Sequence, residues 1–298
     1  MRFDDGRMSD NVESQSGRRG FGLGGGGGGG GGAMLFGLVF SRFGIGGVIV
    51  LFVAMLFLGG NPLGLMDGGT GGAPAGSGAD ARGASVCSAD PARRFACQVL
   101  TSTEDRWGEL FRAQGAAYRP PTLVFYPGSG VSGCGAAQAA MGPFYCPADQ
   151  RIYLDTSFFD ELSRRYGAPG DFAQAYVIAH EVGHHVQTLT GAEERVRRAQ
   201  ANASEAESNA TQVRMELQAD CYAGVWAARA QSNMEPGDLE EGMRAAGAIG
   251  DDTLQRASQG VVVPESFTHG TSAQRQEALL RGYRGGSPQA CAGYADGL

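Results

Sequence analysis

Residues 171–190 read DFAQAYVIAHEVGHHVQTLT, and this stretch organises the rest of the chain. Asp171 and Gln174 form an Asp-x-x-Gln pattern that is typical of a helix N-terminus, and Gly191 is a typical residue after a helix C-terminus. Apolar residues fill much of the segment between these two ends. The sequence therefore predicts a long helix over residues 171–190.

The middle of this predicted helix reads His180-Glu-Val-Gly-His184, the H-E-x-x-H pattern. At 3.6 residues per turn the two histidines share one face, so their imidazoles can bind one Zn²⁺ at about 2.0–2.1 Å. Glu181 lies about a hundred degrees further round, where a general base can take a proton from the attacking water. Gly183 costs roughly 1 kcal/mol in a helix relative to alanine, which indicates a close packing contact. The competing interpretation is a chance match on an exposed amphipathic helix.

A catalytic zinc site usually has a third protein ligand. In some zinc peptidases a third histidine follows shortly after this pattern, but here the corresponding positions are Gln187 and Thr190. The third ligand therefore has to come from further along the chain. Glu216-Leu-Gln-Ala-Asp220 lies in the next predicted helix, and its two carboxylates share a face. One carboxylate can ligate the metal, while the other accepts the free N–H of a ligating histidine, His180 in our assignment.

The remaining histidines have two interpretations each. His185 faces another side of the helix and is predicted to be a packed or surface residue. His269 is either a loop residue or a donor to the oxyanion of the reaction. The chain contains no lysine, which excludes a phosphate-binding P-loop lysine and a Schiff-base lysine.

Composition limits the class of partner. The 298 residues carry 24 basic and 31 acidic side chains, for a net charge of −7, which argues against nucleic-acid binding. The 50 glycines are concentrated in the first 85 residues. We therefore expect a disordered cytoplasmic tail over residues 1–32, a flexible linker over residues 61–84 and a globular domain over residues 85–298.

Residues 33–60 are predicted to form one transmembrane helix. Their second part, FGIGGVIVLFVAMLFLGG, is uncharged and long enough to cross a bilayer. A buried core helix and a cleaved signal peptide are the alternatives. Arg18, Arg19 and Arg42 precede this apolar run, which predicts a cytoplasmic N-terminus and an extracytoplasmic C-terminal domain, in the periplasm or at the cell exterior.

All six cysteines follow the predicted span, which is consistent with disulfides in an oxidising compartment. Six cysteines allow fifteen connectivities. Their spacing suggests the pairs Cys87–Cys97, Cys134–Cys146 and Cys221–Cys291.

Hydrophobic periodicity and turn residues predict the other elements of the globular part. Helices are expected over residues 90–113, 158–166, 204–230, 237–249 and 272–283, and strands over residues 122–126, 144–146 and 151–154.

The chain resembles a family of bacterial membrane-anchored neutral zinc metallopeptidases (YpfJ-like). The resemblance rests on motifs in order along nearly the whole chain: Met1-Arg-Phe-Asp-Asp5, the glycine-rich stretch before one apolar segment, Phe144-Tyr-Cys-Pro147, Ile152-Tyr-Leu-Asp155, residues 180–187, Glu216-Leu-Gln-Ala-Asp220 and His269-Gly-Thr-Ser-Ala-Gln-Arg275. The chain is also similar to zincin-fold gluzincins, in which H-E-x-x-H precedes a ligand glutamate with an aspartate four residues on. The spacing from His269 to Arg275 is similar to a His-Pro-x-x-x-x-Arg segment of membrane gluzincins, with Gly270 in place of the proline.

This resemblance implies an α+β fold, a zincin-like metallopeptidase domain that is mostly helical, with a small β-sheet and an edge strand, behind one N-terminal transmembrane helix. It implies His180, His184 and Glu216 as zinc ligands, with Asp220 in contact with a ligating histidine. It also implies that the strand over residues 151–154 is the edge that pairs with a bound peptide.

We therefore predict a membrane-anchored, zinc-dependent endopeptidase whose general base is Glu181, with His269 as a candidate catalytic residue. Its expected partners are a protein or peptide substrate and the membrane. The main alternative is a zinc-stabilised cell-envelope binding or scaffold protein without catalysis. A zinc-dependent amidase that acts on cell-wall peptide or on another amide is a third interpretation.

Overall fold

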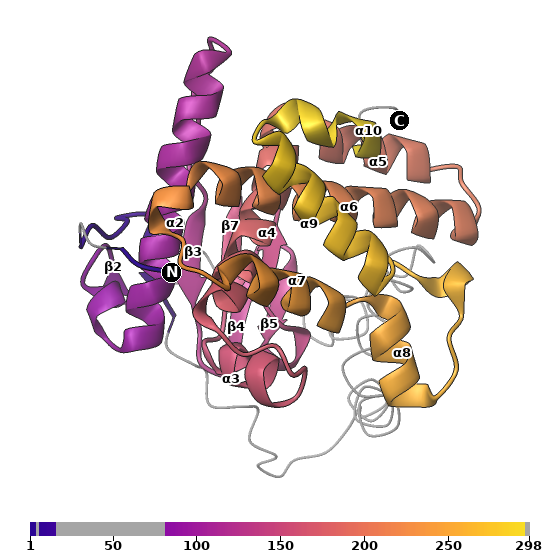
Figure 1. The fold of residues 1–298 in the computed structure, drawn as a ribbon, viewed down its shortest axis with the longest axis horizontal. Coiled ribbons are helices and arrows are strands. Elements are labelled where there is room, and N and C mark those ends of the chain that lie inside the picture. The colour runs from indigo at the N-terminus through magenta and orange to yellow at the C-terminus, as the bar shows by residue number, and fades with distance from the viewer. Residues whose placement is uncertain (4–5, 16–80, 296–298) are drawn as a thin grey trace, which may run out of the picture.

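The structure, a computed structural model, describes residues 1–3, 6–15 and 81–295 (Figure 1). Its helices are α2 (Pro91–Ala113), α3 (Ser157–Arg164), α4 (Asp171–Thr190), α5 (Ala192–Gln200), α6 (Glu205–Arg229), α7 (Asp238–Ala248), α8 (Asp251–Gln259), α9 (Ser272–Gly285) and α10 (Ala292–Ala295). Its strands are β1 (Val12–Ser14), β2 (Ala81–Arg82), β3 (Thr122–Phe125), β4 (Ser129–Ser132), β5 (Gly135–Gln138), β6 (Phe144–Cys146) and β7 (Arg151–Leu154). This content confirms the predicted α+β class.

The main sheet has five strands in the order β2-β1-β3-β7-β6. β1 and β7 run parallel to β3, whereas β2 and β6 are antiparallel to their neighbours and form the two edges. The expectation that residues 151–154 form the edge is wrong, because β7 is hydrogen bonded to β3 on one side and to β6 on the other. The edge on this side of the sheet is β6. β4 and β5 form a separate hairpin.

The N-terminal segment contributes the strand β1 to this sheet. β1 pairs with β3, and Val12 is 1% exposed. The neighbouring side chain of Glu13 accepts a hydrogen bond of 2.9 Å from Arg151 of β7. The prediction of a disordered tail is therefore wrong for residues 1–3 and 6–15. A strand of three residues with one apolar side chain leaves too weak a periodic pattern to be recognised in sequence.

The N-terminal ammonium group lies at the start of α4. It donates to both carboxylate oxygens of Asp171 at 2.8 Å, and to Glu235 and Asp238 at 3.2 and 3.3 Å. α4 begins at Asp171 as predicted, but its N-cap is Gly170 and no side chain caps it. The predicted capping role of Asp171 is wrong because its carboxylate binds the ammonium of Met1 instead.

The predicted membrane span, residues 33–60, lies outside the described residues. Within the described part of the chain, no helix has both the length and the apolar character needed to cross a bilayer.

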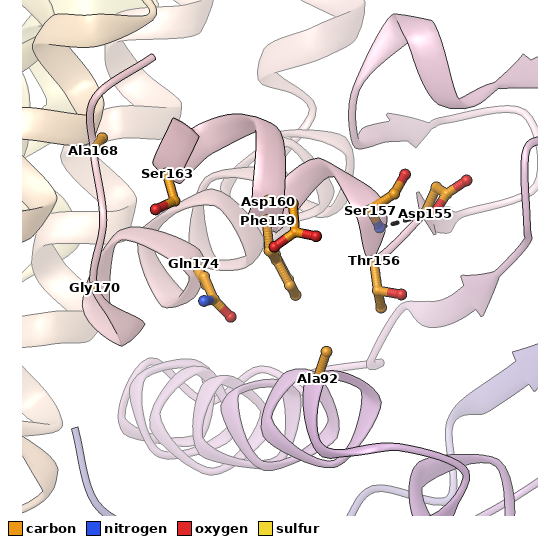
Figure 2. A pocket seen from close by; sticks show the side chains of 10 residues that line it. All are labelled: Ala92, Asp155, Thr156, Ser157, Phe159, Asp160, Ser163, Ala168, Gly170 and Gln174. Carbon is orange, nitrogen blue, oxygen red and sulfur yellow. Dashed lines mark hydrogen bonds between the residues drawn. The ribbon is translucent and has the colours of Figure 1, made fainter. Parts of the chain in front are cut away.

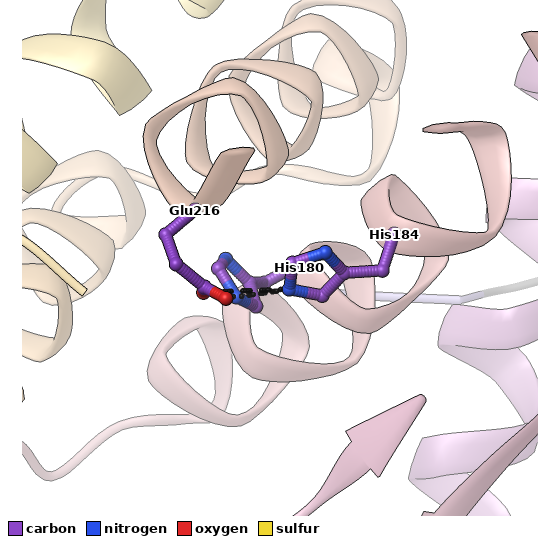
Figure 3. A group of neighbouring side chains, drawn as sticks. All are labelled: His180, His184 and Glu216. Carbon is purple, nitrogen blue, oxygen red and sulfur yellow. Dashed lines mark hydrogen bonds and ion pairs between the residues drawn. The ribbon is translucent and has the colours of Figure 1, made fainter. Parts of the chain in front are cut away.

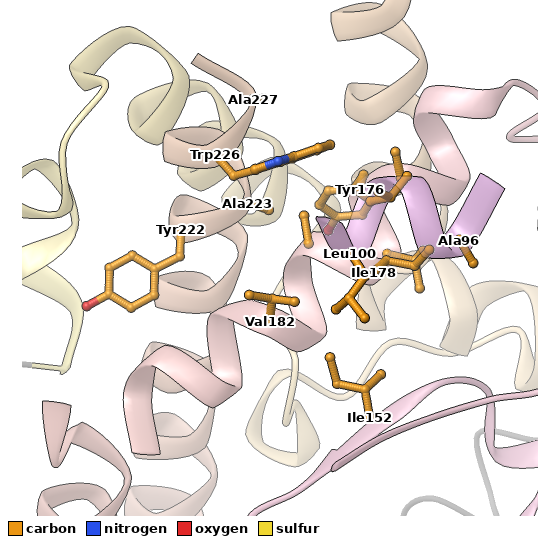
Figure 4. Packing of buried hydrophobic residues seen from close by; sticks show 14 of the residues in the cluster. Ala96, Leu100, Ile152, Tyr176, Ile178, Val182, Tyr222, Ala223, Trp226 and Ala227 are labelled. Atoms are coloured by element: carbon orange, nitrogen blue, oxygen red, sulfur yellow. The ribbon is translucent and has the colours of Figure 1, made fainter. Parts of the chain in front are cut away.

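α4 forms the centre of the core, where it packs against α2, α6 and α7. Ile178 and Val182 of α4 lie among Leu100 of α2, Ile152 of β7 and Trp226 of α6 (Figure 4), and all five are at most 1% exposed. Burial of each such aliphatic side chain contributes about 1.5–3 kcal/mol. The helix that carries the H-E-x-x-H pattern is thus held on several sides by apolar contacts.

All three predicted disulfides are present, namely Cys87–Cys97, Cys134–Cys146 and Cys221–Cys291. The second joins the β4–β5 hairpin to the edge strand β6, and the third joins α6 to the segment after α9. Two of the bonds therefore fix elements that border the predicted metal site.

Candidate metal centre

The predicted ligands meet where α4 passes α6. At Gly183 a β-carbon would lie 2.9 Å from the carbonyl oxygen of Ala219 and 3.0 Å from its Cα. Such distances are shorter than side-chain carbons tolerate, so glycine is what allows the two helices to approach this closely. The predicted packing role of Gly183 is confirmed. It brings the histidines of α4 within reach of Glu216 on α6.

His180, His184 and Glu216 point toward one another (Figure 3). The two Nε2 atoms are 3.1 Å apart, and Oε2 of Glu216 lies 3.2 Å from Nε2 of His180 and 3.4 Å from that of His184. Ligands placed tetrahedrally at the bond lengths of zinc are about 3.3–3.4 Å apart. The three atoms therefore have the spacing of three corners of a zinc coordination tetrahedron.

The second nitrogen of each imidazole has a fixed partner. Nδ1 of His180 donates to Oδ1 of Asp220 at 2.8 Å, and Nδ1 of His184 donates to Oε1 of Gln187 at 2.8 Å. The amide nitrogen of Gln187 donates to the backbone oxygen of Met215 at 2.7 Å, so the side chain presents its oxygen to His184. Both Nε2 atoms consequently carry lone pairs that face each other and a carboxylate. With both imidazoles neutral, these three acceptor atoms repel one another unless a cation lies between them.

Gln187 is a site residue that the sequence argument passed over. The sequence pattern marks it only as a position without a third histidine. Its position three residues after His184, on the same helix face, is the signal that points to it.

The pKa values agree with a cation site. Burial alone would lower the pKa of His180, but Asp220 and Glu216 outweigh it and raise that pKa to about 10. The pKa of His184 is raised in the same way, chiefly by Glu216. Burial alone would raise the pKa of Glu216, but the histidines hold it well below its usual range. Since a ligating imidazole has to be neutral, binding of a metal displaces protons from this site.

Asp220 is fully buried and belongs to a hydrogen-bond network behind His180. It accepts from the hydroxyl of Tyr176 at 2.6 Å and from the guanidinium of Arg275 through two bonds of 2.9 Å each. Burial alone would raise the pKa of Asp220, but Arg275 and His180 bring it to about 2. Asp220 thus lies where the sequence predicted, as an ionised acceptor for the N–H of His180.

Glu181 lies beside the three ligands and is 7% exposed. Burial raises the pKa of its carboxyl group above the ordinary value, and His180 and His184 act in the opposite direction. The backbone N–H of Tyr145 in β6 also acts on this carboxylate and lowers its pKa. The expected base therefore lies close to the edge strand of the sheet.

His185 is a packed residue, which is one of the two alternatives predicted for it; the other was a surface position. Its side chain is fully buried, Nε2 donates to the backbone oxygen of Arg119 at 2.6 Å, and Nδ1 lies 3.1 Å from the hydroxyl of Tyr145. Burial lowers its pKa. Both of its nitrogens have protein partners, so it does not ligate a metal here.

His269 lies in the connection between α8 and α9, close enough to Glu216 for the two to interact electrostatically. Its Nδ1 is 3.3 Å from Oδ1 of Asp251. Oδ2 of Asp251 accepts the backbone N–H groups of three consecutive residues, Thr268, His269 and Gly270. Burial alone would lower the pKa of His269, but Asp251 and Glu216 raise it. Asp251 is a second site residue that the sequence argument did not identify.

Other concave or acidic features lie apart from these residues. A cavity of about 520 Å³ is bordered by α3, the N-terminal turn of α4 and Ala92 of α2 (Figure 2), and its lining contains none of the metal-site residues. Asp171, Asp238 and Glu241 form a second acidic cluster. The ammonium of Met1 already binds two of its members.

Two histidines of α4 and a glutamate of α6, with a buried carboxylate beside them, form a set of side chains suited to hold one Zn²⁺. The family described as "Putative neutral zinc metallopeptidase" matches residues 1–294, and the chain belongs to this family. Zinc is the cofactor of that family, and peptides or proteins are its class of substrate.

Two relatives illustrate the similarity. The "Uncharacterized protein YpfJ" of Escherichia coli (strain K12) is 51% identical over 252 residues, which covers 83% of this chain and 86% of the relative. The "Uncharacterized protein Rv2575" of Mycobacterium tuberculosis (strain ATCC 25618 / H37Rv) is 41% identical over 219 residues, or 68% and 72% of the two chains. No solved structure matches this chain.

Proposed function

We propose that this protein is a zinc-dependent endopeptidase in which His180, His184 and Glu216 hold the metal. The observation that carries the proposal is the convergence of two imidazole lone pairs and one carboxylate oxygen at mutual distances of 3.1–3.4 Å. Bound zinc would supply the polarisation of a peptide carbonyl and of a nearby water.

Glu181 acts as the general base in this proposal. Its carboxylate takes a proton from the water that attacks the peptide carbonyl carbon, and it passes that proton to the departing amine nitrogen. A carboxyl group whose pKa is raised by burial is better matched to both transfers than an exposed one, because the best catalytic pKa lies near the operating pH.

His269 acts as the donor to the oxyanion that forms on the carbonyl oxygen. Support comes from its proximity to Glu216 and from Asp251, which organises the loop and holds Nδ1. An anion that holds one imidazole nitrogen leaves the other free to donate.

The edge strand β6 is the proposed docking strand for an extended peptide. Among the described strands it is the last one on this side of the sheet, and the backbone N–H of its Tyr145 is close enough to the base Glu181 to lower the pKa of that carboxyl group. A peptide that adds to this edge places its backbone next to the base. The edge role that the sequence assigned to residues 151–154 thus passes to residues 144–146.

We also propose that the domain works in an oxidising compartment outside the cytoplasm, with residues 33–60 as a membrane anchor. Three disulfides without a free cysteine among the described residues favour that environment. A segment that crossed the bilayer once between β1 and β2 would put the paired strands β1 and β3 on opposite sides of the membrane. The proposal therefore treats residues 33–60 as an anchor that enters the bilayer without crossing it, and it places residues 1–15 in the same compartment as the domain.

The decisive experiment measures bound metal and peptide hydrolysis for the full chain, for Glu216→Ala and for Glu181→Gln. One zinc per chain is expected in the wild type and in Glu181→Gln, and little in Glu216→Ala. Glu181→Gln should lose about 10²–10⁴-fold in turnover. Wild-type-like turnover in Glu181→Gln would reject Glu181 as the base. Zinc without any peptidase or amidase activity would favour the binding-protein alternative.

A further inference from the structure

Arg275 of α9 is almost completely buried, at 2% exposure, although it does not reach the metal ligands. Its Nε donates to Oδ2 of Asp220 and its Nη2 to Oδ1, both at 2.9 Å. Nη2 also lies 3.2 Å from the hydroxyl of Tyr176, and Nη1 donates to the backbone oxygen of Ile249 at 3.3 Å. The guanidinium is therefore held rigidly, and it binds both oxygens of one carboxylate.

Oδ1 of Asp220 is the atom on which these contacts converge. It accepts from Arg275, from Tyr176 and from Nδ1 of His180. The terminal torsion of an aspartate is broad, so a carboxylate with a single partner can rotate. A bidentate arginine fixes the plane of the carboxylate, which a single hydrogen bond does not.

The packing of α9 on α6 places Arg275 at this point. A β-carbon at Gly282 would lie 1.8 Å from the carbonyl oxygen of Cys221, and one at Gly224 would lie 2.1 Å from that of Leu279. The Cys221–Cys291 disulfide joins the residue next to Asp220 to the segment after α9. Close helix contact and a covalent bond thus fix α9 relative to α6.

We infer that Arg275 and Tyr176 are positioning residues of the metal centre, which fix the carboxylate plane of Asp220 and thereby the direction in which Nε2 of His180 points. The inference rests on the metal site of the proposed function. It assigns a role to a helix that contributes no ligand.

The test is a set of metal-affinity measurements on the full chain, by chelator competition with zinc and by the absorption spectrum of the cobalt(II)-loaded protein. Arg275→Lys retains the charge but loses the bidentate contact, and it should weaken zinc binding by about 10–100-fold and alter the cobalt spectrum. Tyr176→Phe keeps the ring and loses one bond to Oδ1, so a smaller loss in the same direction is expected. Arg281→Lys is the matched control on the same helix, since Arg281 lies over the ring of Tyr294, and it should retain wild-type affinity.

A double-mutant cycle separates positioning from general stabilisation. If Arg275 acts through Asp220, Arg275→Lys should change zinc affinity in the wild type but by less than twofold in an Asp220→Asn background. Equal losses in both backgrounds, or wild-type affinity in both Arg275→Lys and Tyr176→Phe, would overturn the inference. If Arg275→Lys does not fold, the same cycle with Tyr176→Phe decides. Absence of zinc from the wild type would instead reject the proposed function.

Discussion

Gly183 of α4 lies against the backbone of Ala219 of α6, and this contact sets the distance between the helix that carries both histidines and the helix that carries Glu216. A methyl group at position 183 has no room unless the helices separate. Because three ligand atoms have to meet within one coordination sphere, such a separation is expected to affect the metal site first.

Gly183→Ala should therefore weaken zinc binding and lower the thermal stability of the protein. Helix propensity alone predicts the opposite, a gain of up to about 1 kcal/mol. Gly108→Ala in α2 is the matched control, because a β-carbon there meets nothing within 4 Å. Zinc titration and thermal melting of both variants check the prediction, and an unimpaired Gly183→Ala would contradict it.

Gln187 should contribute to metal affinity although it is not a ligand. Gln187→Leu keeps the approximate volume and removes the acceptor for Nδ1 of His184, so zinc affinity should fall by about 10–100-fold. Gln174→Leu on the same helix serves as the control. The two affinities, measured by chelator competition, should differ; equal values would show that the contact with His184 is dispensable.

The N-terminal ammonium should make stability depend on pH above neutrality. Burial alone would lower its pKa, but Asp171, Glu235 and Asp238 raise it above the ordinary value of 8.0. A group whose pKa is raised on folding stabilises the protein fully below the unfolded pKa, and this stabilisation is lost as pH rises through the folded pKa.

A chain extended by two residues before Met1 lacks the ammonium at this point. Its melting temperature should be lower than that of the wild type near pH 7, and the difference should shrink as pH rises above about 8. A difference that stays constant from pH 7 to 10 would show that the extension acts by steric disruption.

Deletion of residues 1–15 should destabilise the domain. It removes β1, so one side of β3 loses its parallel neighbour and Arg151 loses its bond to Glu13. An unpaired strand edge also promotes association between chains. Melting temperature and light scattering of the truncated and full chains test this. A truncated chain that is as stable and as monodisperse as the full one would contradict the role of β1.

The compartment of the N-terminal segment can be determined in cells. Asp10→Cys and Val261→Cys introduce thiols at two exposed positions, one in the N-terminal segment and one after α8. Because β1 and the domain form one sheet, a membrane-impermeant maleimide should label both or neither in intact cells. Labelling of Val261→Cys alone would support the single crossing predicted from sequence.

The elements that sequence predicted correctly are those with strong local signals. The long helix over residues 171–190 is encoded by one continuous periodic segment, and the H-E-x-x-H pair and the acidic pair on α6 each lie within about one or two helical turns. Cysteine spacing was sufficient to predict the three disulfides, because each bond joins two cysteines that are consecutive along the chain.

The features that sequence did not predict depend on contacts between distant segments. β1 pairs with β3 more than a hundred residues away, and Arg275 reaches Asp220 across 55 residues. Gln187 and Asp251 hold histidines through hydrogen bonds that no motif encodes. The edge was assigned to the wrong strand because strand order is a property of the sheet, which local patterns do not specify.

The antiparallel pairing of Ser14 in β1 with Ala81 in β2 also affects how the protein can be engineered. The chain leaves the sheet and returns to it at adjacent positions, so residues 16–80 are, in topological terms, an insertion between the two strands of a hairpin. A two-residue turn such as Asn-Gly can join antiparallel strands. Replacing residues 16–80 with such a turn should give a self-contained domain that keeps β1, whereas a fragment that starts at residue 85 lacks both β1 and β2.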